Sequence, residues 1–340
     1  MRAVVYRETG PSSVLQAVEL DDPTPGAGEV VVRVVRSGIN PTDWKFRAGA
    51  MGGMPGGFDQ VAPGQDGAGR VEAVGEGVSD LAVGDPVWLF MAQSGRPVGT
   101  AAELSVQPVE RVTRLPEGAG FDLGANLGVP AITAHRALTV GDVPRLAPGA
   151  LDGRVVLVAG GAGAVGNAAV QLARWAGATV ITTVSSPEKA ALAEAAGAHH
   201  VVDYRREDVV ARVRAIAPDG VHQVVEVAPA QNLALDLEVV AQHATIGFYA
   251  NNGGDEMTLP VRGAFAKNVA LVGVLLYSVR PDLLRAAADD VTAAVAAGAL
   301  RVGEDAGLPL HHYPLDELAA AHDAVEGGAV GKVLVDVTDA

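Results

Sequence analysis

The first third of the chain alternates short apolar runs with turns. The apolar runs are rich in valine, and glycine and proline residues separate them. They cover residues 2–6, 29–37, 71–74, 86–90 and 102–106. Short strands at this spacing, joined by Gly/Pro turns, are typical of a small antiparallel barrel. We therefore predict an antiparallel β-barrel domain at the start of the chain.

From residue 151 the pattern changes to strands that alternate with helices. Near-continuous apolar runs predict strands at 154–159, 179–184, 200–203, 223–227, 245–249 and 269–277. Helical periodicity lies between them and again after them, at 164–176, 187–196, 209–216, 232–240 and 282–297. This order predicts a parallel sheet covered on both faces, as in doubly wound nucleotide-binding folds. Alternating valines at 333–337 predict a last strand that returns to the first domain.

Composition and charge exclude several classes of protein. The 340 residues include no cysteine, which removes disulfides, thiolate zinc sites and Cys nucleophiles. The net charge of −15 disfavours nucleic acid, whose phosphates are bound mainly by Lys and Arg. The charged start lacks the apolar stretch of a signal peptide, and no run of 18 apolar residues could span a membrane. We predict a soluble cytoplasmic protein that binds neither membranes nor metal.

A glycine-rich loop follows the first strand of the second domain. Gly161, Gly163 and Gly166 form a G-x-G-x-x-G motif between a strand and a helix. In that context the glycines let the backbone approach a pyrophosphate, which the N–H groups at the helix start bind. An ordinary flexible turn is the alternative. We predict a dinucleotide site that also includes Ala164 and Val165.

The end of the second strand bears on which dinucleotide binds. NAD enzymes carry an acidic residue about 20 residues after the motif, where it binds the ribose 2′-hydroxyl. Here Ser185, Ser186 and Lys189 stand instead, a set suited to a 2′-phosphate. Ser186 could equally cap the helix that begins at Pro187, and both roles are compatible. The hypothesis is NADPH rather than NADH.

The sequence resembles the medium-chain dehydrogenase/reductase superfamily, and within it the zinc-free quinone oxidoreductases related to zeta-crystallin. The resemblance covers nearly the whole chain. Besides the glycine loop, it is carried by residues 1–6, 37–43, 63–69, 83–87, 128–138, 185–189, 200–204, 313–318 and 331–334.

The resemblance implies a GroES-like domain of residues 1–126 and 279–340 around a Rossmann domain of residues 127–278, with the active site in the cleft between them. In zinc alcohol dehydrogenases of the superfamily, catalytic ligands fall at the positions of Asn40, Gln65 and Val129. These residues do not form a plausible zinc set. Alcohol oxidation without that Lewis acid is disfavoured.

The resemblance also assigns roles near the nicotinamide and the acceptor. Asn40 and Thr133 would hold an acceptor carbonyl or the carboxamide, with Asp43 at the pocket entrance. A turn cap and a satisfied helix-end hydroxyl are the alternatives for the first two. Gln65 would line the substrate pocket. Trp44 and Met51 stand where relatives often have tyrosine, so a tyrosine proton donor is missing and Trp44 is either a stacking face or simply packed.

Further cofactor contacts follow from the resemblance. They are Tyr204 near the adenosine phosphate, Tyr249, Ala250 and Asn251 near the nicotinamide half, backbone around Leu275 for the carboxamide, and Lys332. Lys332 could instead cap the final strand. Glu226 and Asp236 are interpreted as surface or capping carboxylates. The long apolar strand 269–277 is last in the sheet, and in the family it pairs with a second copy, which predicts a homodimer.

The expected reaction is hydride delivery from NADPH to a quinone or a similar activated acceptor, without zinc. Two alternatives stay open. One is a 2-alkenal, enone or enoyl-thioester reductase on the same scaffold. The other is a cofactor-binding protein with vestigial catalysis.

Overall fold

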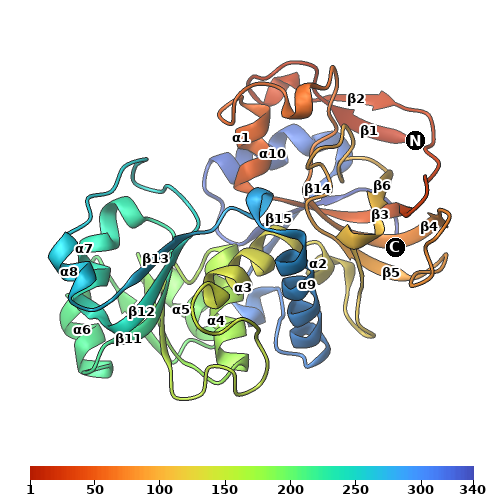
Figure 1. The fold of residues 1–340 in the computed structure, drawn as a ribbon. Helices are drawn as coiled ribbons and strands as arrows, with labels where there is room; N and C mark the ends of the chain where they lie inside the picture. The colour runs from red at the N-terminus through yellow and green to blue at the C-terminus, as the bar shows by residue number, and fades with distance from the viewer. The chain divides into compact units, whose positions relative to one another are not determined.

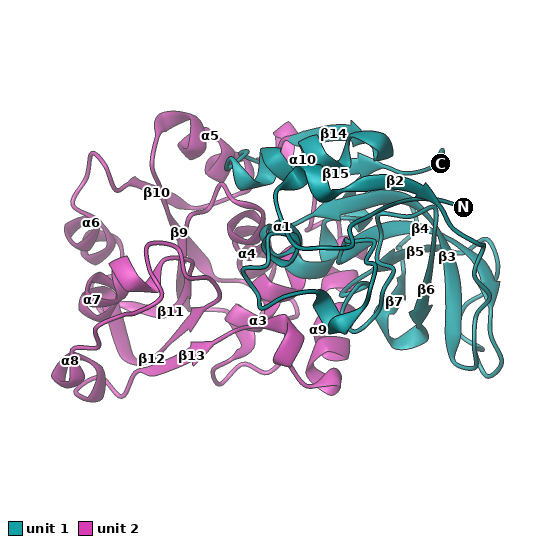
Figure 2. Ribbon diagram, turned by 90° about the horizontal axis from the view of Figure 1, so that it is seen from above, with its two compact units in different colours: residues 1–129, 310–340 teal, residues 130–309 magenta.

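The computed structural model describes residues 1–340, and the chain divides into two compact units. Unit 1 comprises residues 1–129 and 310–340, and unit 2 comprises residues 130–309 (Figure 2). No helix combines the length and the hydrophobicity that a membrane crossing requires.

Unit 1 is built mainly from antiparallel strands. Its elements are β1 (Arg2–Val5), β2 (Gln16–Glu19), β3 (Glu29–Ile39), α1 (Pro41–Arg47), β4 (Asp66–Val74), β5 (Pro86–Leu89), β6 (Leu104–Pro108), β7 (Val112–Arg114), α2 (Phe121–Gly124), β14 (Leu310–Pro314), α10 (Leu318–Glu326) and β15 (Lys332–Asp336). Seven strands form one sheet in the order β14-β15-β3-β4-β5-β7, with β6 also paired to β3. The predicted return of the last strand is confirmed, because β15 pairs antiparallel with β3.

The long strand β3 organises this unit. Its valines are buried because the strand is covered on both faces, and Val30 and Val32 pack with Val71 and Leu89 in one core cluster. A second cluster joins Val34 of the same strand to residues of α10 and β15. Strand β3 therefore ties the early strands to the C-terminal segment, and α1 begins directly beyond its end.

Unit 2 contains a six-stranded parallel sheet with helices on both faces (Figures 1 and 2). Its elements are α3 (Ile132–Thr139), β8 (Val155–Ala159), α4 (Ala164–Trp175), β9 (Thr179–Val184), α5 (Pro187–Ala195), β10 (His200–Asp203), α6 (Val209–Ile216), β11 (Val221–Glu226), α7 (Pro229–Val239), β12 (Val240–Phe248), α8 (Val261–Phe265), β13 (Ala270–Gly273) and α9 (Pro281–Ala296). A π-helical turn, Leu127–Ala131, precedes α3. The strand order β10-β9-β8-β11-β12-β13 is the Rossmann order 3-2-1-4-5-6, so the predicted doubly wound sheet is confirmed.

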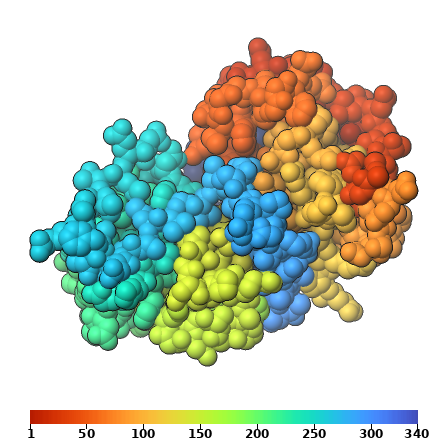
Figure 3. All heavy atoms as spheres, viewed as in Figure 1, coloured from red at the N-terminus to blue at the C-terminus, as the bar shows by residue number.

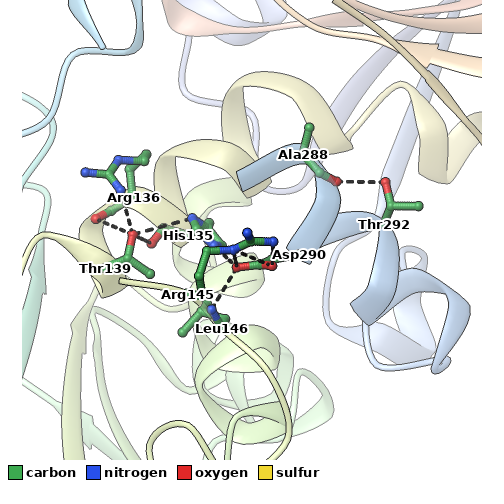
Figure 4. A network of polar contacts seen from close by, with 8 residues as sticks. All are labelled: His135, Arg136, Thr139, Arg145, Leu146, Ala288, Asp290 and Thr292. Carbon is green, nitrogen blue, oxygen red and sulfur yellow. Dashed lines mark hydrogen bonds and ion pairs between the residues drawn. The ribbon is translucent and has the colours of Figure 1, made fainter. Parts of the chain in front are cut away.

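Residues 279–309 lie in unit 2, which corrects the predicted domain boundary. Helix α9 is held there by a polar cluster around the buried Asp290 carboxylate, which meets the buried His135 ring, the half-exposed Arg145 guanidinium and the Leu146 N–H (Figure 4). Further along, the Asn167 amide of α4 donates to the Ala306 carbonyl at 2.8 Å. These polar contacts were invisible in the sequence, because their partners are more than 130 residues apart.

The edge strand β13 is shorter than predicted. It spans only Ala270–Gly273, and a short 3₁₀ turn, Leu276–Ser278, follows where the strand was expected to continue. The Val274 N–H still donates to the Phe248 carbonyl of β12 at 2.8 Å. The predicted position at the edge of the sheet is confirmed.

Candidate functional site

The glycine loop of unit 2 joins β8 to α4, as the motif predicts. Gly160 turns the chain at φ +73°, and Gly163 is the N-cap residue of α4. The first N–H groups of a helix have no partner within it, so those of Ala164, Val165 and Gly166 are available to an anion. The loop therefore has the geometry of a phosphate site at a helix start.

The three motif glycines have different reasons for lacking a side chain. A Cβ on Gly161 would lie 2.2 Å from Thr182 Oγ1, and one on Gly166 would lie 2.2 Å from the Gly160 carbonyl oxygen. Those two glycines permit close packing of strand, loop and helix. A Cβ on Gly163 would meet nothing nearer than 3.6 Å, and this residue is exposed. The space over Gly163 is thus open for a ligand rather than filled by the protein.

The residues predicted to bind the 2′-phosphate of NADPH follow the end of β9. Ser186 caps α5, because its hydroxyl accepts a hydrogen bond from the Lys189 N–H at 3.3 Å. The same hydroxyl lowers the pKa of the exposed Glu188 carboxyl by hydrogen bonding to it. Ser185 and Lys189 are half-buried, and Tyr204 is exposed just after the neighbouring strand β10. A phosphate bound here would meet Lys189 but would also meet the carboxylate of Glu188.

The residues predicted for the nicotinamide half follow β12 and β13. Tyr249, directly after β12, donates its backbone N–H to the Glu226 carbonyl at 3.1 Å, and Asn251 binds the Asp255 carboxylate. Ala250 lies between them, half-buried, and Leu275 is half exposed just after β13. Carboxyl ends of parallel strands meet at one sheet edge, which is where dinucleotides bind in this fold.

Glu226 and Asp236 are not surface carboxylates, which corrects that part of their interpretation, whereas Glu226 does accept hydrogen bonds at the start of α7, as the capping alternative predicts. Both are about 1% exposed, and burial raises the pKa of each carboxyl. Glu226 accepts hydrogen bonds from the Ala228 N–H and the Asn232 amide, and its proximity raises the pKa of Asp236 further. The pair consists of two buried carboxyl groups, and the charge of Glu226 opposes ionisation of Asp236. Periodicity alone did not show whether the face of α7 that carries Asp236 is packed inward or exposed.

In unit 1 a buried polar cluster surrounds Asn40, at the junction of β3 and α1. The Asn40 amide nitrogen donates to Asp66 Oδ2 at 2.8 Å and to the Gly38 carbonyl at 3.3 Å. Its amide oxygen accepts from Lys332 Nζ at 2.8 Å. Asn40 also occupies the N-cap position of α1, where its backbone carbonyl, rather than its side chain, accepts the Asp43 N–H at 3.0 Å.

Asp43 is the other predicted catalytic residue of this region. Its Oδ2 accepts the Asn40 N–H at 2.7 Å, while Oδ1 is buried without a hydrogen-bond partner. Burial raises the pKa of Asp43 to about 7, with a further contribution from the charge of Asp66, against the opposing effects of the Asn40 N–H and Lys332. The Asp43 carboxyl is only 2% exposed. It can thus carry or release a proton near neutral pH.

Asp66 is the residue that the sequence reasoning missed. It is fully buried, and its Oδ1 accepts the Val129 N–H at 2.7 Å. Burial raises its pKa, and Lys332, whose Nζ lies 3.6 Å from Oδ2, opposes that shift. Lys332 is also buried, which lowers its pKa. The only indication in the sequence was the position of this aspartate at the centre of the glycine-rich segment 63–69. Nothing in the sequence indicated which residues it contacts.

The remaining predicted residues differ in their surroundings. Gln65 is buried beside the cluster, where its amide nitrogen donates to the Gln93 amide oxygen at 3.0 Å and its own oxygen has no partner. Trp44 is half-buried in α1 and Met51 is exposed. Thr133 belongs to unit 2, where it is buried at the start of α3. The structure thus brings Asn40, Asp43 and Lys332 together around Asp66.

A surface cavity lies elsewhere in unit 2. A hollow of about 650 Å³ is lined by Arg174, Trp175 and Arg301 among others. Trp175 ends α4, whereas the phosphate loop begins it, so this cavity is not part of the predicted cofactor site. No cluster of three or more His, Cys, Asp or Glu side chains could hold a metal ion.

Comparison with known proteins agrees with this architecture. Residues 26–117 match the alcohol dehydrogenase GroES-like domain, and residues 164–293 match the zinc-binding dehydrogenase family. A quinone oxidoreductase of Rattus norvegicus is 30% identical over 98% of this chain and 97% of its own length. A 2-haloacrylate reductase of a Burkholderia species is 29% identical over 96% of both chains.

Among solved structures, a mycobacterial protein complexed with NADPH is 29% identical and superposes with a TM-score of 0.81, over 99% of this chain and 100% of its own. The family models match the predicted GroES-like and Rossmann domains in the predicted order. The chain therefore belongs to the medium-chain dehydrogenase/reductase superfamily, in its quinone oxidoreductase family, and is an oxidoreductase of that kind.

Proposed function

We propose that this protein is an NADPH-dependent reductase of quinones or similarly activated acceptors, and that it works without zinc. The observation that carries the proposal is the open position over Gly163 at the start of α4, followed by Ser185 and Lys189 in place of an acidic residue. The quinone oxidoreductases that it resembles and the NADPH complex of a relative support the same reading. The cytoplasmic location stays a prediction.

The cofactor would supply a hydride, and the chain's own residues would orient it and manage the proton. The N–H groups at the start of α4 face the pyrophosphate position, and Lys189 offers a cation to the 2′-phosphate. Reduction of a quinone by a hydride also consumes one proton. Asp43, with its Oδ1 free of hydrogen bonds and a pKa raised to about 7, is the carboxyl beside Asn40 that we assign to hold it at neutral pH.

Zinc is not part of this function because of the side chains at three positions. In the zinc-dependent relatives these positions carry the zinc ligands. Asn40 and Gln65 offer neutral amides, and Val129 offers no side-chain ligand. The Asn40 amide is already engaged by Lys332 and Asp66. Hydride delivery to an acceptor that is already electrophilic does not need a Lewis acid.

A second candidate is reduction of an activated carbon–carbon double bond. The similarity to a 2-haloacrylate reductase supports it at nearly the same identity as the quinone enzymes. Steady-state NADPH consumption with naphthoquinones, enones, 2-haloacrylate and enoyl thioesters separates the candidates. Turnover with naphthoquinones alone supports the first, and turnover with alkenes alone replaces it with the second. NADPH binding without turnover of either class supports a vestigial role.

The cofactor proposal is tested by titration of NADPH and NADH against the protein's fluorescence. Lys189→Ala should weaken NADPH at least about tenfold, because a charge-assisted contact contributes on the order of 1.5–3 kcal/mol, and should leave NADH unchanged. Arg212→Ala, which removes an exposed cation on α6, is the matched control. Equal affinity of the wild type for both cofactors would refute the preference for NADPH.

The homodimer is also a proposal. Strand β13 ends the sheet, and the segments just before and just after it carry the exposed apolar side chains Val261, Phe265 and Leu275. Figure 3 shows this stretch, in cyan to light blue, at the surface of unit 2. An unpaired edge with apolar neighbours favours pairing with a second copy. Light scattering at micromolar concentration should give twice the chain mass, and Phe265→Glu should give monomers; a monomeric wild type would refute the dimer.

A further inference from the structure

The polarity of the Asn40 amide is fixed from both ends. Lys332 Nζ lies 2.8 Å from the amide oxygen, and Asp66 Oδ2 lies 2.8 Å from the amide nitrogen. A cation must face the oxygen and a carboxylate must face the nitrogen. The amide therefore cannot rotate by half a turn without placing both ends against groups of the wrong kind.

The hydrogen-bonding capacity of this amide is nearly exhausted. Both N–H groups are used, one by Asp66 and the other by the Gly38 carbonyl at 3.3 Å. The oxygen has two lone pairs, and Lys332 takes one. The one hydrogen-bonding position left for a ligand is the second lone pair of Oδ1. At that position the amide can only accept a hydrogen bond.

The surroundings hold this arrangement rigidly. Asn40, Asp66 and Lys332 are each no more than 2% exposed, so water does not compete for their hydrogen bonds. Asp66 is itself fixed by the Val129 N–H, and a Cβ on Gly128 would lie 2.1 Å from Asp66 Oδ1. Three separate segments, ending β3, beginning β4 and beginning β15, thus supply the three side chains.

We propose that Lys332 and Asp66 are positioning residues that make Asn40 an obligate hydrogen-bond acceptor toward its ligand. This assignment, which rests on the proposed function, means that Asn40 does not hold the carbonyl of a quinone. Its partner carries an N–H or an O–H, as in the carboxamide of NADPH or the hydroxyl of a hydroquinone product.

A reciprocal exchange of side chains tests the assignment. Asn40→Asp alone brings two carboxylates into hydrogen-bond distance, so the melting temperature should fall, kcat/KM should drop on the order of a hundredfold and its pH profile should gain an ionisation. The double variant Asn40→Asp with Asp66→Asn restores opposite partners across the same contact. It should recover most of the loss in melting temperature, although the Gly38 carbonyl still lacks its donor. It should also lose the added ionisation and regain at least about tenfold in kcat/KM, because position 40 still offers an acceptor.

Recovery of the melting temperature without recovery of kcat/KM would overturn the proposal, because it would mean that the amide N–H of Asn40 is what the reaction needs. Asp59→Asn, an exposed carboxyl in the same unit, is the matched control. Wild-type NADPH binding is measured first. Its absence would refute the proposed function, whereas binding with an unrescued double variant would refute only the assignment of Asn40.

Two comparisons identify the donor. The first is KM for NADPH against its 3-acetylpyridine analogue, which lacks the amide N–H, and the second is inhibition by a hydroquinone against its dimethyl ether. Lys332→Met frees the amide, so it should reduce the preference for the donor-bearing ligand about fivefold in whichever pair contains the partner. Ratios unchanged from wild type in both pairs would show that the cluster is only structural and would overturn the proposal.

Discussion

Each unit of this protein contains a polar cluster around a buried aspartate, Asp290 in unit 2 and Asp43 in unit 1, and the hydrogen bonds of these two carboxylates are completed to different degrees. In unit 2 the Asp290 carboxylate receives Arg145, His135 and the Leu146 N–H, so both of its oxygens are used (Figure 4). In unit 1 Asp43 Oδ1 and Gln65 Oε1 are buried without partners. Buried polar atoms are nearly always satisfied in folded proteins, so unsatisfied ones need a reason.

The pKa values of the two aspartates separate the groups further. Although burial alone would raise it, hydrogen bonds from His135 and Arg145 hold the pKa of Asp290 at about 2. The pKa of Asp43 is raised to about 7 because burial dominates there. The surroundings of Asp290 keep its carboxylate ionised at neutral pH, whereas Asp43 can gain or lose a proton there. We therefore interpret the Asp290 cluster as structural and the Asn40–Asp43–Asp66–Lys332 cluster as the functional one.

The largest effect is expected from Asp290→Ala. Removing this carboxylate leaves His135 Nε2 and the Leu146 N–H without partners in the interior. Loss of one member of a buried pair typically costs about 3–5 kcal/mol of unfolding free energy. Urea denaturation measures the change, and the exposed neighbour Asp289→Ala should cost no more than about 0.5 kcal/mol. Equal effects of the two variants would contradict a structural role for the cluster.

Asp43→Asn should act on catalysis instead. The amide can still accept the Asn40 N–H, but it cannot carry the proton that the carboxyl holds at neutral pH. The turnover number should fall on the order of a hundredfold, the usual contribution of general acid catalysis. Stopped-flow and steady-state NADPH oxidation measure it, with Asp59→Asn as control. An unchanged turnover number would remove Asp43 from the proton step.

The two aspartates should also give pH dependences of opposite sign. A raised folded pKa means that Asp43 binds its proton more tightly when folded, so its contribution to stability is largest in acid and is lost as pH rises from 3.8 to about 7, at most about 1.4 kcal/mol per pH unit. The lowered pKa of folded Asp290 has the opposite consequence. Its contribution to the free energy of unfolding is complete above pH 3.8 and disappears as the pH falls toward 2. Unfolding free energies of the wild type, Asp43→Asn and Asp290→Ala between pH 2 and 8 test both signs.

The smallest effect on stability is expected from Gln65→Leu. This change removes a buried oxygen that has no partner, but it also leaves the Gln93 amide oxygen without its donor. The two changes oppose each other, so the unfolding free energy should move by less than about 1 kcal/mol. The KM for a quinone should change severalfold, since Gln65 is predicted to line the acceptor pocket. A large loss of stability with an unchanged KM would place Gln65 with the structural group.

Features that depend on local pattern were predictable from the sequence. The valine runs of β8 and β9 and the glycine spacing at 161–166 identified the Rossmann sheet and its phosphate loop, because both signals are confined to short stretches of chain. The limits of β13 and the domain boundary at residue 279 were not predictable from the sequence. They depend on contacts between distant residues, such as that of Asp290 with His135, 155 residues away.

The candidate site divides in the same way. Asn40 and Asp43 could be proposed as candidates because they lie in a recognisable segment, and their geometry at the start of α1 is local. The contact of Lys332 with Asn40 joins residues 292 positions apart, and the burial of Glu226 and Asp236 depends on which face α7 turns inward. Periodicity does not report on either. A single sequence therefore indicates which residues carry chemistry more readily than which partners control them.

Strand β15 also sets the order in which the protein can mature. During synthesis residues 130–309 leave the ribosome before residues 310–340, so unit 2 can fold while unit 1 still lacks its last strand. Lys332 begins that strand, and only its arrival beside β3 brings the ammonium to Asn40. A nascent or truncated chain could then already hold a nucleotide, yet its first sheet would be unfinished and its polar cluster unassembled.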